Sequence, residues 1–181
     1  SGAAVTSFSV LSVAPATEEM KATNTGAVRV AQFAGSCDFG SPHGGPFFYA
    51  THLVELAISL LGERVVALRA LRAGDTVSVD IAWEHDLVAN LGYFKDAAPT
   101  FRASVFGTEA AVSREIVVDD EAYTAALNVI VEMFASGQRP RDDRQLLRPV
   151  VMVHAMIQSL DRGGEWVDVA TMLDDEIEAL R

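Results

Sequence analysis

Residues 44–62 read Gly-Gly-Pro-Phe-Phe-Tyr-Ala-Thr-His-Leu-Val-Glu-Leu-Ala-Ile-Ser-Leu-Leu-Gly, and the rest of the chain is arranged around this segment. Gly45 is a permissive N-cap, Pro46 suits the first helical position because its missing N–H would be unpaired there, and Gly62 suits a left-handed C-cap. The residues between them are apolar almost all round, which predicts a buried helix of about four turns. One polar stripe interrupts the apolar surface: Thr51, His52, Glu55 and Ser59.

His52 and Glu55 are three residues apart, so they occupy neighbouring positions on one face of the predicted helix. A carboxylate beside an imidazole favours the charged ring, which would let His52 titrate near physiological pH and act as an acid or a base. The alternative is a hydrogen-bonded core histidine with Glu55 as its partner. Two residues at this spacing leave both interpretations open.

Composition limits the class of protein. The chain has 181 residues, half of them hydrophobic, which is enough for one domain with a substantial core, and we treat residues 1–181 as that single domain. The formal net charge of -11 argues against nucleic acid or an anionic membrane as a partner, because both would be repelled. A small molecule or another protein subunit is the expected partner.

The single cysteine, Cys37, has no partner for an internal disulfide and is expected to be a small core or loop thiol. The chain does not open with a charged and then apolar signal segment, and no apolar run is long enough to span a bilayer. These features predict a cytoplasmic location.

Hydrophobic periodicity predicts an α+β fold. Residues 76–83 alternate strictly between apolar and polar side chains, which is typical of a strand with one face on a core. Further strands are expected at residues 3–13, 27–33, 64–71, 87–94, 101–106, 111–118 and 166–169, and further helices at 16–23, 120–135, 143–160 and 171–181. Short consecutive strands with tight connections are expected to pair antiparallel.

Residues 35–45 are too rich in glycine, serine and proline to form a helix or strand. A long loop before a buried helix often carries binding residues, and His43 is either a ligand contact or a solvent-facing side chain. The spacings G-x-G-x-x-G and G-x-x-x-x-G-K-[ST] are both absent, so the sequence does not predict a nucleotide loop here.

The late part of the chain offers two weaker candidates. The arginines 139, 141, 144 and 148 invite a phosphate-binding interpretation, but Asp142 and Asp143 offset their charge, and we expect a solvated linker. His154 lies among apolar residues and is expected to be a core histidine. The predicted helix from residue 120 carries one apolar stripe, formed by Tyr123, Leu127, Ile130 and Phe134.

Taken together, several motifs resemble one known family. Residues 44–55, followed by Leu60-Leu61-Gly62, are similar to the signature of the C-terminal domain of the Gfo/Idh/MocA oxidoreductases, the glucose-fructose oxidoreductase and inositol dehydrogenase superfamily. Other segments match in order: Leu91-Gly92-Tyr93-Phe94, Val105-Phe106-Gly107-Thr108, Arg148-Pro149-Val150 through Gln158-Ser159, Gly163-Gly164 and Val167. The resemblance covers about residues 8–169.

This resemblance implies an open, mostly antiparallel sheet with helices packed on one face. The other face of the sheet would pair subunits into a homo-oligomer, and the side near the signature helix would bind a sugar, a polyol or a related small molecule. His52 matches the histidine that helps to move the substrate hydroxyl proton during hydride transfer. Tyr49, Thr51 and Glu55 would shape its surroundings, and His43 is carried as a further substrate contact.

Two departures from the family pattern matter. The nucleotide-binding Rossmann half is absent, and neither Lys21 nor Lys95 stands in the family's Glu-Lys-Pro setting. We therefore expect no cofactor site in this chain, NAD or NADP in the full-length protein, and no activity of the chain alone. In addition, Phe48 occupies the position where many active members have an aspartate. The alternative function is a non-catalytic ligand-binding or dimerisation module.

Overall fold

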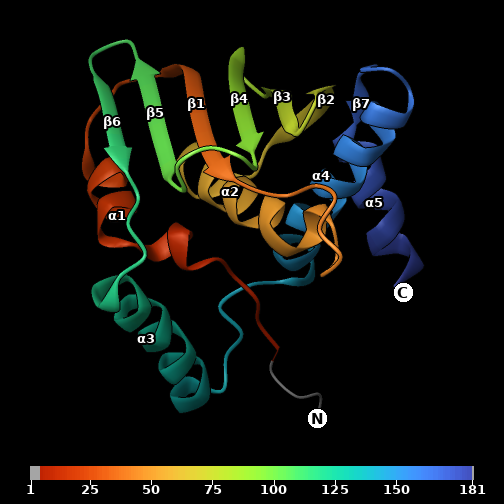
Figure 1. Cartoon of the computed structure of the whole chain (residues 1–181). Helices are drawn as coiled ribbons and strands as arrows, with labels where there is room; N and C mark the ends of the chain where they lie inside the picture. The colour runs from red at the N-terminus through yellow and green to blue at the C-terminus, as the bar shows by residue number, and fades with distance from the viewer. Residues whose placement is uncertain (1–4, 181) are drawn as a thin grey trace.

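Seven strands form one open sheet, and the helices lie on one face of it (Figure 1). This computed structural model describes residues 5–180. The strands are β1 (Val28–Ser36), β2 (Val65–Ala73), β3 (Thr76–Trp83), β4 (Leu87–Phe94), β5 (Phe101–Gly107), β6 (Ala111–Glu115) and β7 (Val167–Asp168). Their order across the sheet is β6-β5-β1-β4-β3-β2-β7. The predicted α+β class, with a mostly antiparallel sheet, is confirmed.

The prediction that consecutive strands pair antiparallel holds within β2-β3-β4 and within β5-β6, but it fails between β4 and β5. Strand β3 pairs antiparallel with β2 and β4, and β5 pairs antiparallel with β6. Strands β4 and β5 are not neighbours, because β1 lies between them, parallel to β4 and antiparallel to β5. The long connection from β1 to β4, which includes a helix and two strands, is what permits this parallel pair.

Alternation along the strands divides the sheet into a buried and an open face. On β3 the side chains of Val77, Val79, Ile81 and Trp83 are buried, whereas those of Thr76 and Ser78 are exposed. The indole N–H of Trp83 donates to the carbonyl of Gly62 over 3.0 Å, which ties the end of the central helix to the sheet. This strand lies where its sequence predicts.

The predicted central helix is α2 (Pro46–Leu61), and its glycine caps lie where expected. Gly45 and Gly62 have φ values of 57° and 87°, which favour residues without a Cβ. The helix packs on β1 and β4, and the buried hydroxyl of Tyr93 donates to the carbonyl of Ala50. Beside α2 lies α4 (Asp143–Asp161), which contacts α5 (Val169–Ala179).

The expected strand at residues 3–13 is wrong; residues 3 and 4 lie outside the described part of the chain. Residues 10–13 form a single 3₁₀ turn, η1 (Val10–Val13), followed by α1 (Pro15–Ala22). The Ser9 hydroxyl accepts from the N–H of Leu11 and caps this turn, while the N–H of Ser9 donates to Glu55. The backbone groups that a strand would need are thus already bonded to side chains.

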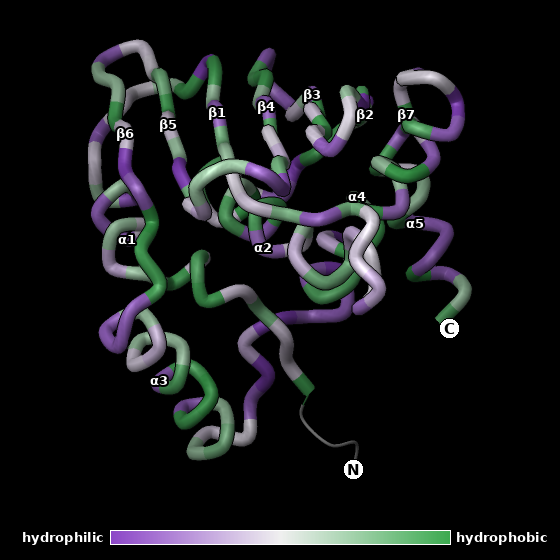
Figure 2. The backbone as a smooth tube through the Cα atoms, viewed as in Figure 1, coloured by the Kyte–Doolittle hydropathy of each residue, from purple (hydrophilic) through white to green (hydrophobic). Residues whose placement is uncertain are grey.

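The helix α3 (Asp120–Ser136) begins at an Asp119 cap and ends at Gly137, close to the predicted bounds. It packs against η1 and α1 through small residues and Met133, and buries Ala122 and Ala126. Most of the predicted apolar stripe faces outward, which is contrary to the usual inward orientation of such a stripe. Figure 2 shows apolar positions on this projecting helix, and the exposed ones are Tyr123, Leu127, Val131 and Phe134.

His154 is exposed, so its prediction as a core histidine is wrong. Its ring packs edge to face on that of Phe47, with 5.0 Å between the centroids. The neighbours Met152 and Val153 turn inward on α4, and the helical period carries position 154 outward to the start of α2. Within residues 5–180, no helix combines the length and the apolar character that crossing a bilayer requires.

Candidate active site

His52 lies on α2 and is held through one of its two ring nitrogens. Its Nδ1 lies 2.9 Å from the hydroxyl oxygen of Ser9, a residue from the segment before η1. Its Nε2 has no hydrogen-bond partner among residues 5–180, and it is not among the fully buried polar atoms that lack one. The ring is therefore fixed in orientation while one nitrogen remains available to a ligand.

The surroundings of His52 disfavour its charged form. Burial lowers the pKa of the imidazole below its usual value, and the negative charge of Glu55 opposes this shift only in part. The neighbouring carboxylate does favour the charged ring, as expected, but desolvation outweighs it, so the net shift is opposite to the one expected. At neutral pH the ring is uncharged, which is the form that accepts a proton.

Glu55 is buried and directs its carboxylate away from an imidazole contact. Its Oε2 accepts from the backbone N–H of Ser9 over 2.9 Å and from the guanidinium of Arg141 over 2.7 Å. Arg141 also donates to the carbonyl of Ser7 and lies 5.6 Å from the ring centroid of Phe8. Glu55 therefore positions Ser9, which in turn holds His52.

The arginine segment is not simply a solvated linker, so that expectation needs correction. Arg141 reaches into the fold to neutralise Glu55, and its side chain is only 23% exposed. Arg148 is buried and donates to Glu63 over 2.8 Å. In contrast, Arg139 and Asp143 form an exposed pair four residues apart. Two of the four arginines thus neutralise carboxylates of α2 and of the segment that follows it.

Two other predicted site residues lie apart from the ring nitrogen. The Thr51 hydroxyl donates to the carbonyl of Phe47 over 3.5 Å, which is a bond within α2. His43 is exposed on the loop before the helix, where its backbone N–H donates to the hydroxyl of Ser41. Neither residue lines the cavity described below.

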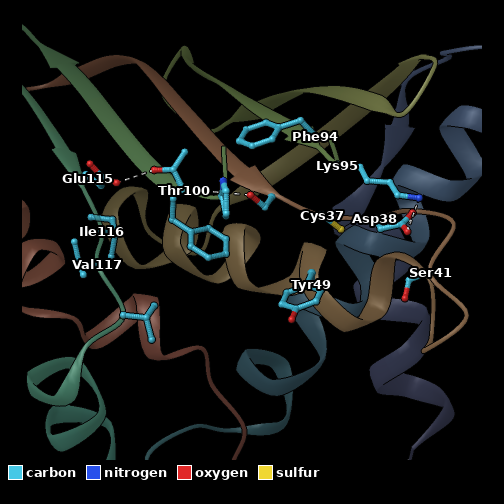
Figure 3. Close-up of a pocket in the computed structure, with 14 residues that line it drawn as sticks. Cys37, Asp38, Ser41, Tyr49, Phe94, Lys95, Thr100, Glu115, Ile116 and Val117 are labelled. Atoms are coloured by element: carbon cyan, nitrogen blue, oxygen red, sulfur yellow. Dashed lines mark hydrogen bonds and ion pairs between the residues drawn. The ribbon is translucent and has the colours of Figure 1, made fainter. Parts of the chain in front are cut away.

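A cavity of about 510 Å³ lies at the end of the sheet, beside the start of α2 (Figure 3). Tyr49 comes from α2, and the remaining lining residues come from the ends of β1, β4, β5 and β6 and the segments that follow. The lining residues are Ser36, Cys37, Asp38, Ser41, Tyr49, Phe94, Lys95, Pro99, Thr100, Phe101, Glu115, Ile116, Val117 and Val118. This volume is typical of small-molecule sites.

Tyr49 connects the cavity to His52. The two rings lie three residues apart on α2, and their centroids are 6.0 Å apart. On its other side, Tyr49 packs edge to face with Phe48, at 4.7 Å. The Tyr49 hydroxyl has no hydrogen-bond partner among the described residues. Of the five site residues predicted from the sequence, Tyr49 alone lines this cavity, and His52 lies next to it through its contact with the Tyr49 ring.

The charged groups of the cavity are already paired. Lys95 lies 3.1 Å from Asp38, and this contact, together with the N–H of Gly40, lowers the pKa of Asp38. The same carboxylate raises the pKa of Lys95. On the opposite side, the hydroxyl of Thr100 donates to Glu115 over 3.1 Å. Glu115 is also paired with Arg102 at 3.2 Å, so each charged side chain that lines the cavity has an oppositely charged partner within the chain.

Cys37 forms an uncharged part of the cavity wall. Burial raises the pKa of its thiol to about 12, and the adjacent carboxylate of Asp38 adds to the shift. The thiol therefore stays protonated at neutral pH, and it is not activated as a nucleophile. Its predicted role as a small core thiol is confirmed.

The residues present do not fit a dinucleotide. The loop between β1 and α2 contains no lysine or arginine, its Asp38 already pairs with Lys95, and the sequence lacks the glycine fingerprint. Within residues 5–180, no three His, Cys, Asp or Glu side chains are grouped so that they would hold a metal ion.

Comparison with known proteins gives matches at the level of structure. No protein-family model and no curated protein sequence matches the chain. A Sinorhizobium meliloti 1021 protein assigned as a myo-inositol dehydrogenase superposes with a TM-score of 0.76 at 18% identity, over 89% of this chain and 64% of its own. A myo-inositol dehydrogenase from Corynebacterium glutamicum ATCC 13032 gives 0.72 at 13% identity, over 88% and 62%. The chain has the fold of these dehydrogenases.

A levoglucosan dehydrogenase solved with NADH and levoglucosan shares the same dehydrogenase fold, with a TM-score of 0.70 at 14% identity over 89% of this chain and 64% of its own. The chain thus spans less than two thirds of the length of these three proteins. The sequence resemblance to Gfo/Idh/MocA-type dehydrogenases is confirmed for the fold.

Some residues around the site could not be identified from the sequence. Ser9 and Arg141 are separated from His52 by 43 and 89 positions, and no local spacing indicates their role. Phe101 and Val117 were expected only as parts of strands. The sequence carries one chemical indication of Arg141. A carboxylate that is buried on an apolar helix needs a cation as its partner, and the arginines between residues 139 and 148 can supply one.

Proposed function

We propose that this chain is the substrate-binding and oligomerisation domain of an NAD(P)-dependent dehydrogenase that acts on a sugar, a polyol or a related hydroxyl compound. The observation that carries the proposal is the position of His52. Its Nδ1 is anchored on Ser9 while its Nε2 has no described partner, and its ring neighbours Tyr49 at a cavity of ligand size. An anchored, neutral imidazole beside such a cavity suits general-base chemistry.

His52 would perform the proton-transfer part of the reaction. When Nδ1 carries the proton and donates to the Ser9 oxygen, the lone pair of Nε2 is free to accept the proton of a substrate hydroxyl. The lowered pKa keeps the ring neutral and ready to accept that proton at pH 7. Tyr49 would orient the substrate through its unpaired hydroxyl, while Glu55 and Thr51 support the helix and the ring from outside the cavity.

The redox cofactor would be held by a nucleotide-binding domain that this chain does not contain. NAD(P) accepts a hydride in such reactions. The loop between β1 and α2 does not fit its pyrophosphate, and the matched dehydrogenases are longer than this chain. The chain alone is therefore expected to bind a substrate and not to turn it over.

The open face of the sheet supports the oligomerisation role. One apolar row crosses six strands there in direct register: Ala111, Phe106, Val30, Val88, Ala82 and Ala67. The three larger members, Phe106, Val30 and Val88, are 39%, 43% and 49% exposed. Such an apolar row can pack against the same row of a second copy of the chain that is related to the first by a two-fold axis.

The second candidate is a non-catalytic ligand-binding or dimerisation module. Phe48 favours it, because an exposed aromatic ring stands one helical turn before His52, where the resemblance expects a carboxylate. A phenyl ring can neither accept a proton nor orient the imidazole. In this module, the cavity and the sheet face would keep their roles without the chemistry.

Turnover by the natural full-length protein separates the two candidates. NAD⁺- and NADP⁺-dependent oxidation of a panel of sugars and polyols would be measured for the wild type and for His52→Asn, which retains a hydrogen-bonding group near the Nδ1 position. The dehydrogenase predicts that kcat falls about 100- to 10,000-fold in the variant. Equal rates would remove His52 from the chemistry, and a wild type that oxidises none of the panel would support the non-catalytic module.

A further inference from the structure

The two sides of the cavity differ in chemistry. Figure 3 places Asp38 and Lys95 on one side, Ile116 and Val117 on the opposite side, and Tyr49 between them. The other apolar lining residues are Phe94, Pro99, Phe101 and Val118. Glu115 also lies on the side of Ile116 and Val117, and we call the apolar lining residues of the cavity the apolar wall.

Several polar groups near this wall are already bonded within the protein. Thr100 uses its hydroxyl to donate to Glu115 and its backbone N–H to donate to the hydroxyl of Ser36 over 3.3 Å. Across the cavity, Asp38 is already bonded to Lys95 and to the N–H of Gly40. A bare polyol carries hydroxyls on every side, and those that faced the apolar wall would lose their water without gaining a partner.

We propose that the apolar wall takes an alkyl or aryl group of the substrate, so that the substrate class is a hydroxyl compound with an apolar substituent rather than a bare polyol. This inference rests on the proposed dehydrogenase function and deepens it. The hydroxyl-bearing part lies at Tyr49, on the side of the cavity next to His52, and the substituent lies against Ile116 and Val117. The cavity is large enough for both parts at once.

The inference is tested by binding to the 181-residue chain, with NMR chemical shifts as the readout. The probes are phenyl β-D-glucopyranoside, D-glucose and myo-inositol. All three are six-membered rings that carry several hydroxyls, and only the phenyl glucoside carries an apolar group. We expect the phenyl glucoside to bind at least about tenfold more tightly than either bare compound, because burial of its phenyl ring adds apolar contact. Its shifts should map to Phe101, Ile116 and Val117.

A matched pair of variants locates the effect. Val117→Thr keeps the shape of the side chain at an exposed position and makes the wall more polar. It should weaken the binding of the phenyl glucoside about two- to fivefold and leave the affinity for D-glucose unchanged. Val66→Thr, at a valine of similar exposure on β2, should change neither affinity. Both substitutions are at exposed positions and are compatible with folding.

Three outcomes would overturn the inference: equal affinity for the phenyl glucoside and the bare compounds, shifts that map away from the wall, or no binding of the phenyl glucoside. None of them decides the proposed function, because His52-dependent turnover in the full-length protein tests that separately. If D-glucose or myo-inositol bound more tightly than the phenyl glucoside, the dehydrogenase proposal would stand with a bare polyol as its substrate class.

Discussion

The carboxylate of Glu55 lies 2.7 Å from the guanidinium of Arg141 and so joins the buried face of α2 to the segment between α3 and α4. The same oxygen accepts from the N–H of Ser9, whose hydroxyl contacts His52. An interaction between residues 86 positions apart thus sets the orientation of the candidate catalytic ring. The stability of the fold and the position of His52 are therefore coupled through Glu55.

Removal of Arg141 should destabilise the fold. In Arg141→Met the aliphatic part of the side chain is kept, but the largely buried carboxylate of Glu55 loses its cation. We expect the free energy of unfolding to fall by about 1.5–3 kcal/mol, measured by urea denaturation. Arg139→Met removes an exposed ion pair and should cost less than about 1 kcal/mol. Equal losses in the two variants would contradict the buried role of Arg141.

Stability should depend on pH through His52. Because burial lowers the pKa of the folded imidazole below its ordinary value of 6.5, the unfolded chain binds a proton that the folded chain does not between these two values. The free energy of unfolding should therefore decrease as the pH falls below about 6.5 and stop changing, for this group, below the folded pKa. The difference between wild type and His52→Asn in denaturation at a series of pH values isolates this contribution. A difference that is independent of pH would contradict it.

The open face of the sheet should hold two copies together. Val88 lies in the middle of the apolar row, beside Val30 on one side and Ala82 on the other. Val88→Arg would place a charge at the centre of the contact and should convert a dimer into a monomer in sedimentation equilibrium, with monomer stability changed by less than about 0.5 kcal/mol. Val131→Arg, on the exposed side of α3, is the control. A monomeric wild type would refute the sheet-face assembly.

Cys37 should react slowly with thiol reagents. Its side chain is 3% exposed, and burial raises its pKa to about 12, so little thiolate is present or accessible at pH 8. Iodoacetamide should modify the folded chain far more slowly than the chain unfolded in urea, as followed by mass spectrometry. Modification at similar rates in both states would show that the cavity wall opens readily.

The sequence predicts the parts of this fold that depend on local chemistry. Gly45, Pro46 and Gly62 mark the ends of α2 because caps and first-turn preferences are local. The alternation of Val77 and Val79 with polar neighbours marks β3 for the same reason. These elements were expected with bounds that agree closely with the structure.

Features that depend on distant residues were missed. Strand β1 inserts between β4 and β5, and neither its own sequence nor theirs encodes that neighbour relationship. Residues 5–13 have strand formers, yet the Ser9 bonds to Glu55 and Leu11 favour a turn that packs on α2 and α3. At the site, helical spacing indicates His52 and Glu55, and Tyr49 was expected from the family resemblance, whereas the cavity wall requires four strand ends to meet.

The central claim is that Nε2 of His52 faces a bound hydroxyl compound. The most direct measurement is the ¹⁵N chemical shift of the two His52 ring nitrogens in the chain, recorded with and without phenyl β-D-glucopyranoside at saturation. The account predicts that the Nε2 resonance moves while Nδ1, held by Ser9, changes little. A ring whose two resonances stay in place when the cavity is occupied would contradict it.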